Sequence, residues 1–153
     1  MIQLSKNLTD IQISKSYQAI EKGLRNNIDP EALEALVALA ENIYEPLFEN
    51  FNTIFILDGY ISKELNDSLE YKKYEQHTRG QCLSIALNAS GSNNLKKVFE
   101  YVINNLKYDT IIWEFGSIFE PDWITISYVK NNNRKRNLIS YKDQKGNTQY
   151  RTF

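Results

Sequence analysis

Apolar residues at helical spacing come first in this chain and strand-like runs follow, and this order limits the fold more than any other feature. Asp29 suits the N-cap of a helix and Pro30 its first position. Behind them an amphipathic stripe predicts a helix, and it comprises Leu33, Leu36, Val37, Ala40, Ile43 and Leu47. We expect Pro46 to end or bend this helix near Tyr44, because proline cannot donate a helical hydrogen bond.

A weaker helix is expected upstream over residues 13–24, with Tyr17, Ile20 and Leu24 on one side. A further helix is indicated at 95–106 by apolar residues spaced three and four apart.

Strands are predicted where β-branched and aromatic residues cluster between turn signals. These runs are residues 52–57, 80–87, 110–115, 123–129 and 137–141, and the tail 144–153 is expected to add an edge strand. Helices followed by a mostly antiparallel sheet predict the α+β class. At 153 residues, one domain over 1–153 is expected.

The charge balance argues against two classes of partner. Eighteen basic and nineteen acidic residues leave a net charge of −1, so nucleic acid and anionic membrane are not expected as main partners. No apolar run approaches the ~18 residues that cross a membrane, and residues 1–6 show no secretion signal. We therefore expect synthesis and folding in a cytoplasm. The single cysteine, Cys82, lies in an apolar run and is interpreted as a small buried side chain.

Four stretches, in order, resemble one family, the zinc D-Ala-D-Ala carboxypeptidase-like peptidases of bacteria and phage endolysins. LEALVALAENIYEPL (33–47) resembles the family's L-x-x-L-A-x-x-I-L-x-P-L helix, and DGYISKELN (58–66) resembles S-G-Y-R-S-x-x-L-N. EQHTRGQCLS (75–84) resembles S-Q-H-x-x-G-x-A-x-D, and IWE (112–114) with WITIS (123–127) resembles I-W-E followed by W-x-H-x-S. The resemblance covers roughly residues 2–140 and implies a domain with N-terminal helices packed on a mostly antiparallel sheet.

The resemblance also implies a site. The family holds zinc with two histidines and one aspartate, and uses a glutamate base and an arginine. Carried over, the first histidine is His77, the aspartate falls on Ser84, the second histidine on Thr125, the arginine on Ile61 and the glutamate on Glu114.

These departures predict that the metal site is lost. Serine and threonine hydroxyls are poor zinc ligands, since protein zinc sites use thiolate, imidazole and carboxylate groups. We therefore expect no metal, no cofactor and no catalysis. Two alternatives stay open: an improvised site of His77, Cys82 and Glu114, and an active zinc peptidase that cleaves peptidoglycan stem peptides through an unusual site.

A peptidase fold without its ligands is expected to serve as a structural or binding module. Because the family is common on phages, a virion component, either capsid-decorating or tail-associated, is the most concrete expectation, with other protein subunits as partners. The basic stretch 130–136 is interpreted as a hairpin loop. Candidate interface residues are aromatic or basic, and they are Tyr71, Tyr74, Arg134, Lys135, Arg136, Tyr150 and Phe153.

Overall fold

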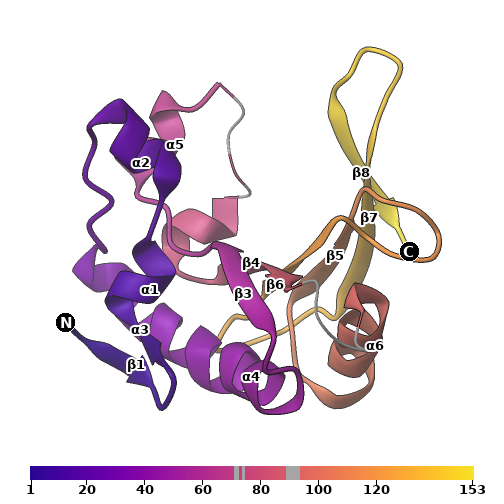
Figure 1. Cartoon of the computed structure of the whole chain (residues 1–153), viewed down its shortest axis with the longest axis horizontal. Helices are drawn as coiled ribbons and strands as arrows, with labels where there is room; N and C mark the ends of the chain where they lie inside the picture. The colour runs from indigo at the N-terminus through magenta and orange to yellow at the C-terminus, as the bar shows by residue number, and fades with distance from the viewer. Residues whose placement is uncertain (71–72, 74, 89–93) are drawn as a thin grey trace.

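A six-stranded mixed sheet runs through the centre of the molecule, and its strand order is β3-β4-β6-β5-β7-β8. The computed structural model describes residues 1–70, 73, 75–88 and 94–153. The strands are β3 (Ile54–Asp58), β4 (Cys82–Leu87), β5 (Thr110–Glu114), β6 (Trp123–Ser127), β7 (Arg136–Lys142) and β8 (Thr148–Thr152). The N-terminal helices lie at one end of the sheet and the β7–β8 hairpin projects at the other (Figure 1). The predicted α+β class is confirmed.

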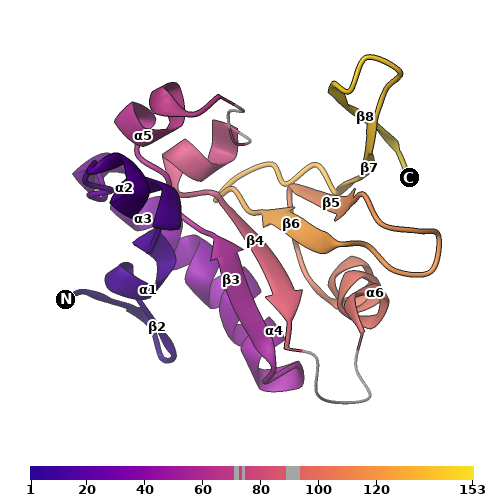
Figure 2. The ribbon, with the colours of Figure 1, turned by 45° about the horizontal axis from the view of Figure 1, so that its top comes forward.

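Within the six-stranded sheet, four of the five strand pairings are antiparallel, as expected, and the fifth is parallel. β5 pairs with β6 on one side and, in parallel, with β7 on the other. The prediction that residues 130–136 form a hairpin loop is therefore wrong. A hairpin would place β7 beside β6, whereas the loop carries the chain past β5 (Figure 2). The expected edge strand in the tail is β8, which pairs with β7 only.

The predicted helix at Asp29–Pro30 is α3 (Pro30–Leu39), and it continues beyond its expected end. A π-helical turn, η1 (Ala40–Tyr44), and a short helix, α4 (Glu45–Asn50), follow without a break. In the π turn the Glu45 amide donates to the Ala40 carbonyl, five residues earlier. Pro46 thus changes the helical geometry in front of it without ending the helix, because a proline in the first turn needs no amide partner.

Two short helices replace the one expected over 13–24. They are α1 (Asp10–Ser14) and α2 (Tyr17–Lys22), and the break follows from the Ser16 hydroxyl, which accepts from the Ala19 amide and caps α2. Tyr17 and Ile20 are 74% and 71% exposed, so the apolar side that the spacing suggested is not buried.

The N-terminal strands form a separate ribbon that the sequence did not indicate. β1 (Gln3–Ser5) pairs with β2 (Leu8–Thr9). The Glu45 carboxylate anchors this ribbon to the helix, since it accepts from the Ser5 hydroxyl at 2.6 Å and from the Asn7 amide at 2.6 Å.

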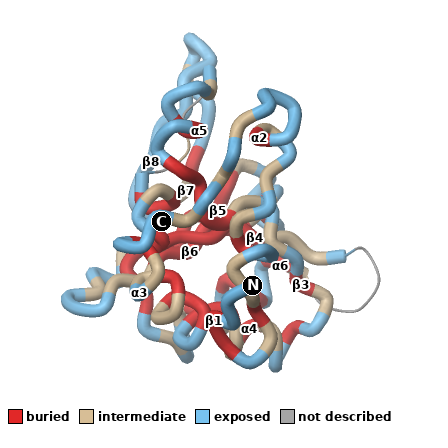
Figure 3. The backbone as a smooth tube through the Cα atoms, turned by 90° about the vertical axis from the view of Figure 1, so that its left-hand side faces the viewer, coloured by how far each residue is buried: buried red, intermediate tan, exposed pale blue. Residues whose placement is uncertain are grey.

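The two faces of the sheet differ in chemistry because side chains alternate along each strand. One face is apolar and carries Leu83, Ile85, Ile111, Trp113, Ile124 and Ile126, which form one core with residues of α3, η1, α4 and α6 (Leu95–Asn105). The alternate residues of β4, β5 and β6 face the other way, are mostly polar, and are nevertheless buried. Figure 3 shows the buried residues concentrated in these central strands.

Short helices lie beside the polar face at the β4 end. They are α5 (Lys63–Ser68) and the 3-10 helix η2 (Glu75–Arg79). Ala19, Ile61 and Leu65 form a second, small apolar cluster there. None of the helices in the described ranges is long and apolar enough to cross a membrane.

Candidate functional site

Strand register brings the candidate site residues together on the polar face of the sheet. Ser84 of β4 lies opposite Thr125 of β6. On β5, Glu114 is two residues from Ile112, the direct partner of Thr125, so it lies on the same face. Ser140 of β7 is the register partner of Glu114 in the parallel pair. Four strands thus each contribute one polar side chain to one place.

These side chains form a continuous hydrogen-bonded chain. The Thr125 hydroxyl donates to Glu114 Oε1 at 2.9 Å, and the Ser140 hydroxyl donates to Glu114 Oε2 at 2.6 Å. Because the proton of Thr125 is used in this way, the 2.8 Å contact between Ser84 Oγ and Thr125 Oγ1 has Ser84 as its donor. The carboxylate therefore accepts from a hydroxyl at each oxygen.

His77 lies beside the Ser84 end of this chain. It lies on η2, is 2% exposed, and its Nδ1 is 2.8 Å from the Gly59 carbonyl oxygen. Only a protonated Nδ1 can donate to a carbonyl, so Nε2 carries the lone pair. Nε2 lies 3.5 Å from Ser84 Oγ and 3.6 Å from Cys82 Sγ. Burial lowers the pKa of His77, which favours the neutral imidazole that this arrangement requires.

Burial also shifts the two acids of the cluster. It raises the pKa of Glu114, although the bonds from Ser140 and Thr125 oppose this shift. It raises the pKa of the Cys82 thiol well above its usual range, and the carboxylate of Glu114 adds to the effect. Cys82 is therefore held as a thiol, and the prediction that it is buried is confirmed.

Ile61 does not join the other candidates through its side chain. It packs in the small cluster with Ala19 and Leu65, and only its backbone amide reaches the site, at 3.3 Å from the His77 carbonyl oxygen. The position that the resemblance assigns to an arginine is apolar and 3% exposed.

The cluster does not fit a zinc ion as it stands. Ser84 and Thr125 offer hydroxyls that already bond to each other and to Glu114. Among the described residues there is no group of three His, Cys, Asp or Glu side chains that could hold a metal.

Nor does the cluster form a nucleophile and base in the usual manner. Ser84 and His77 lie 3.5 Å apart, which is longer than a good hydrogen bond. The imidazole is oriented by a backbone carbonyl, and both side chains are almost completely buried. A substrate would need the surrounding structure to open before it reached either group.

Ser140 is the member of this cluster that the sequence did not reveal. A serine in a strand carries no distinctive signal, and with β7 assigned to a hairpin with β6 it would not lie beside Glu114.

The two tryptophans are packed against aromatic rings: Trp113 is edge-on to Phe99 at 5.3 Å between ring centroids, and the Trp123 ring centroid lies 5.5 Å from that of Phe115.

The basic candidate interface residues bind their own domain. Arg134 donates through Nε and Nη2 to the buried Asp109 carboxylate at 2.9 and 2.6 Å, and Arg136 donates to Thr110 Oγ1 at 3.2 Å. Lys135 Nζ lies 5.8 Å from the centroid of the Tyr108 ring. Bonding to Arg134 lowers the pKa of Asp109 to about 2.

The aromatic candidates differ in position. Tyr71 and Tyr74 lie outside the described residues. Tyr150 is 45% exposed on β8. Phe153 packs against Phe99 and Trp113, with centroid distances of 5.0 and 5.7 Å.

Comparisons with protein-family models, with curated proteins and with solved structures give no match for this chain. The resemblance to zinc peptidases therefore stays a hypothesis that rests on the sequence motifs.

Proposed function

We propose that the protein is a non-enzymatic structural or binding module built on a peptidase-like scaffold. The observation that carries this proposal is the hydrogen-bonded chain from Ser84 through Thr125 and Glu114 to Ser140, in which neutral hydroxyls stand where the resemblance puts zinc ligands. A buried polar network in which the members bond to one another stabilises one arrangement of strands. The cluster thus has a structural role that needs neither metal nor substrate.

The spacing of the cluster also supports the idea that a metal once bound there. Two ligands at about 2 Å from a tetrahedral zinc ion lie about 3.3 Å apart. The distance from His77 Nε2 to Ser84 Oγ is 3.5 Å. Replacing the hydroxyl at this position with a carboxylate would supply the missing charge.

We expect the purified wild-type protein to contain less than about 0.1 zinc per chain and to release no D-alanine from peptidoglycan stem peptides. The double variant Ser84→Asp/Thr125→His should bind about one zinc per chain, because it provides the imidazole and carboxylate ligands that zinc requires. Elemental analysis after dialysis against zinc measures the zinc content of both proteins, and circular dichroism checks that the variant folds.

The matched control is the same double variant with His77→Gln, which should lose the zinc again. One zinc per wild-type chain, lost together with hydrolysis in His77→Gln, would overturn the proposal. Failure of a folded double variant to bind zinc would count against the placement of Ser84 and Thr125.

The positive role that we propose is that of a subunit in a larger protein assembly. Two features of β8 support this. It is an edge strand, and all five of its residues are exposed. Edge strands readily pair with other chains unless something covers them. The more specific proposal, a capsid or tail subunit of a phage particle, rests on the resemblance alone.

If β8 is the contact surface, Tyr150→Asp should reduce incorporation into particles at least tenfold without unfolding the domain, because a buried charge opposes association. Quantitative mass spectrometry of particles purified from a host that carries the gene gives the copy number. Tyr17→Asp is the matched control, since Tyr17 is equally aromatic, 74% exposed and located on α2. Absence of the wild-type chain from particles, or equal losses for the two variants, would contradict this role.

A further inference from the structure

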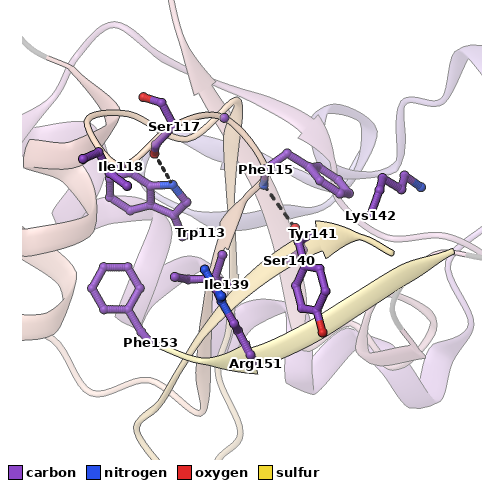
Figure 4. A pocket seen from close by; sticks show the side chains of 11 residues that line it. Trp113, Phe115, Ser117, Ile118, Ile139, Ser140, Tyr141, Lys142, Arg151 and Phe153 are labelled. Carbon is purple, nitrogen blue, oxygen red and sulfur yellow. Dashed lines mark hydrogen bonds between the residues drawn. The ribbon is translucent and has the colours of Figure 1, made fainter. Parts of the chain in front are cut away.

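An apolar pocket lies on the opposite face of the sheet from Ser84 and Thr125. Its volume is about 450 Å³, within the range typical of small-molecule sites. β5, β7, β8 and the turn after β5 line it (Figure 4). The pocket shares Ser140 with the hydroxyl cluster and β8 with the proposed contact surface, whereas His77, Ser84 and Thr125 take no part in its lining.

Aromatic and branched side chains form most of its lining. Trp113 and Ile139 are register partners on β5 and β7, and Phe153 packs against the Trp113 ring. Tyr141 follows two residues after Ile139, so it extends the same face. Flat rings favour an aromatic body in the ligand, because ring pairs add about 0.5–1.5 kcal/mol beyond the area that they bury.

A strained turn fixes the opposite wall. Phe115 has a φ of 52° and Gly116 a φ of 70°, so two consecutive residues are left-handed. For phenylalanine this conformation is unfavourable and needs support from its surroundings. Ser140 Oγ accepts from the Phe115 amide at 3.2 Å, and the Ser117 carbonyl accepts from Trp113 Nε1 at 3.0 Å (Figure 4). The wall is therefore held in place before any ligand binds.

One cation belongs to this face. Arg151 is the register partner of Ile139, and its guanidinium lies 5.6 Å from the centroid of the Tyr141 ring. No ion pair joins it to a carboxylate of the described ranges, and no acidic residue lines the pocket. The other lining cation, Lys142, already has partners: its Nζ donates to Thr148 Oγ1 at 2.7 Å and lies 5.4 Å from the centroid of the Phe115 ring.

We propose that this pocket binds a small aromatic carboxylate, with the ring against Trp113 and Phe153 and the carboxylate on Arg151. A guanidinium pairs with a carboxylate through two parallel hydrogen bonds, which gives direction as well as charge. The apolar walls exclude water from the ring.

Titration with 4-phenylbutanoate, followed by the indole N–H signal of Trp113 in ¹H–¹⁵N NMR spectra, tests the proposal. We expect a dissociation constant of about 0.1–1 mM, as suits a ligand of this size. The neutral 4-phenylbutanamide should bind about tenfold more weakly, because it retains the ring and loses the charge.

Arg151→Gln should weaken binding of the acid about tenfold and leave binding of the amide unchanged, whereas Arg151→Lys should retain part of the preference for the acid. Lys145→Gln, at the exposed tip of the same hairpin, is the matched control and should change neither affinity. The proposal is overturned if the indole signal does not shift at about 10 mM acid, which is ten times the weakest expected dissociation constant. Equal binding of acid and amide, or an Arg151→Gln affinity within twofold of wild type, would overturn it as well.

Discussion

Gly80→Ala is expected to lower the free energy of unfolding by more than about 3 kcal/mol, a large part of the 5–15 kcal/mol that a domain usually has. Gly80 has a φ of +70°, which costs a residue with a side chain about 1–2 kcal/mol. A Cβ there would also lie 2.7 Å from the Ala32 carbonyl oxygen and 2.8 Å from Leu36 Cγ. Relief of these contacts would push α3 away from the segment that joins η2 to β4.

Gly146→Ala is the matched control for this prediction. Its φ is +79°, and a Cβ there would meet nothing within 4 Å. It should therefore lose only the backbone contribution, about 1–2 kcal/mol. Urea unfolding followed by tryptophan fluorescence measures both variants. A Gly80→Ala protein whose free energy of unfolding is within about 1 kcal/mol of the control, or about fivefold in equilibrium constant, would contradict the packing argument.

Arg134→Gln is expected to cost about 2–3 kcal/mol at pH 7, because it leaves the buried carboxylate of Asp109 without its cation. Asp109 is 1% exposed, so water cannot replace the bonds that its carboxylate loses. The Arg134 side chain is 52% exposed, so water already solvates part of it in the wild type. The Asp109 bonds from Gln76 and from the Arg134 backbone amide remain in the variant.

The same variant should change the acid sensitivity of the protein. The pKa of Asp109 is about 2 when folded, below its ordinary 3.8, so its contribution is present above pH 3.8 and is lost as the pH falls through 2. This contribution is about 2 kcal/mol in wild type and should be smaller in Arg134→Gln. The difference between the two proteins should therefore narrow from pH 5 to pH 2 in urea unfolding.

Lys130→Gln provides the matched control for Arg134→Gln. Lys130 pairs with Glu34, and both side chains are more than half exposed. Exposed pairs contribute about 0–1 kcal/mol. A loss as large for Lys130→Gln as for Arg134→Gln would show that burial of Asp109 is not the cause.

Most of the strands could be predicted because their signal is local. The apolar runs at 110–115 and 123–129 correspond to β5 and β6, and the tail forms the expected edge strand β8. Spacing also located α3 and α6. It failed for residues 13–24, because the exposed Tyr17 and Ile20 mimic a buried stripe and the Ser16 cap divides the helix.

The partners of the strands could not be predicted from such local signals. A run such as 137–141 has the same pattern whether its neighbour is parallel or antiparallel, so the β5–β7 pairing was missed, and Ser140 with it. The meeting of His77, Ser84, Thr125 and Glu114 was expected only through the family resemblance. The pocket at Arg151 depends on the same unpredicted pairing.

The parallel pairing of β5 with β7 also bears on the order in which the domain folds. An antiparallel pair such as β5–β6 can form outward from its connecting turn, whereas Thr110 meets Arg136 only after a loop of 26 residues has closed. Contacts between residues distant in sequence form late, because closure loses chain entropy before the contacts compensate for it. The β4–β6 pairing, which joins Leu83 to Ile126, spans a still longer stretch of chain. We therefore expect the β5–β6 and β7–β8 hairpins to form first and to dock afterwards. The last bond to Glu114 and the Arg151 side of the pocket are completed only when the β7–β8 hairpin docks on β5, so a chain that stalls before this step would contain both hairpins and neither site.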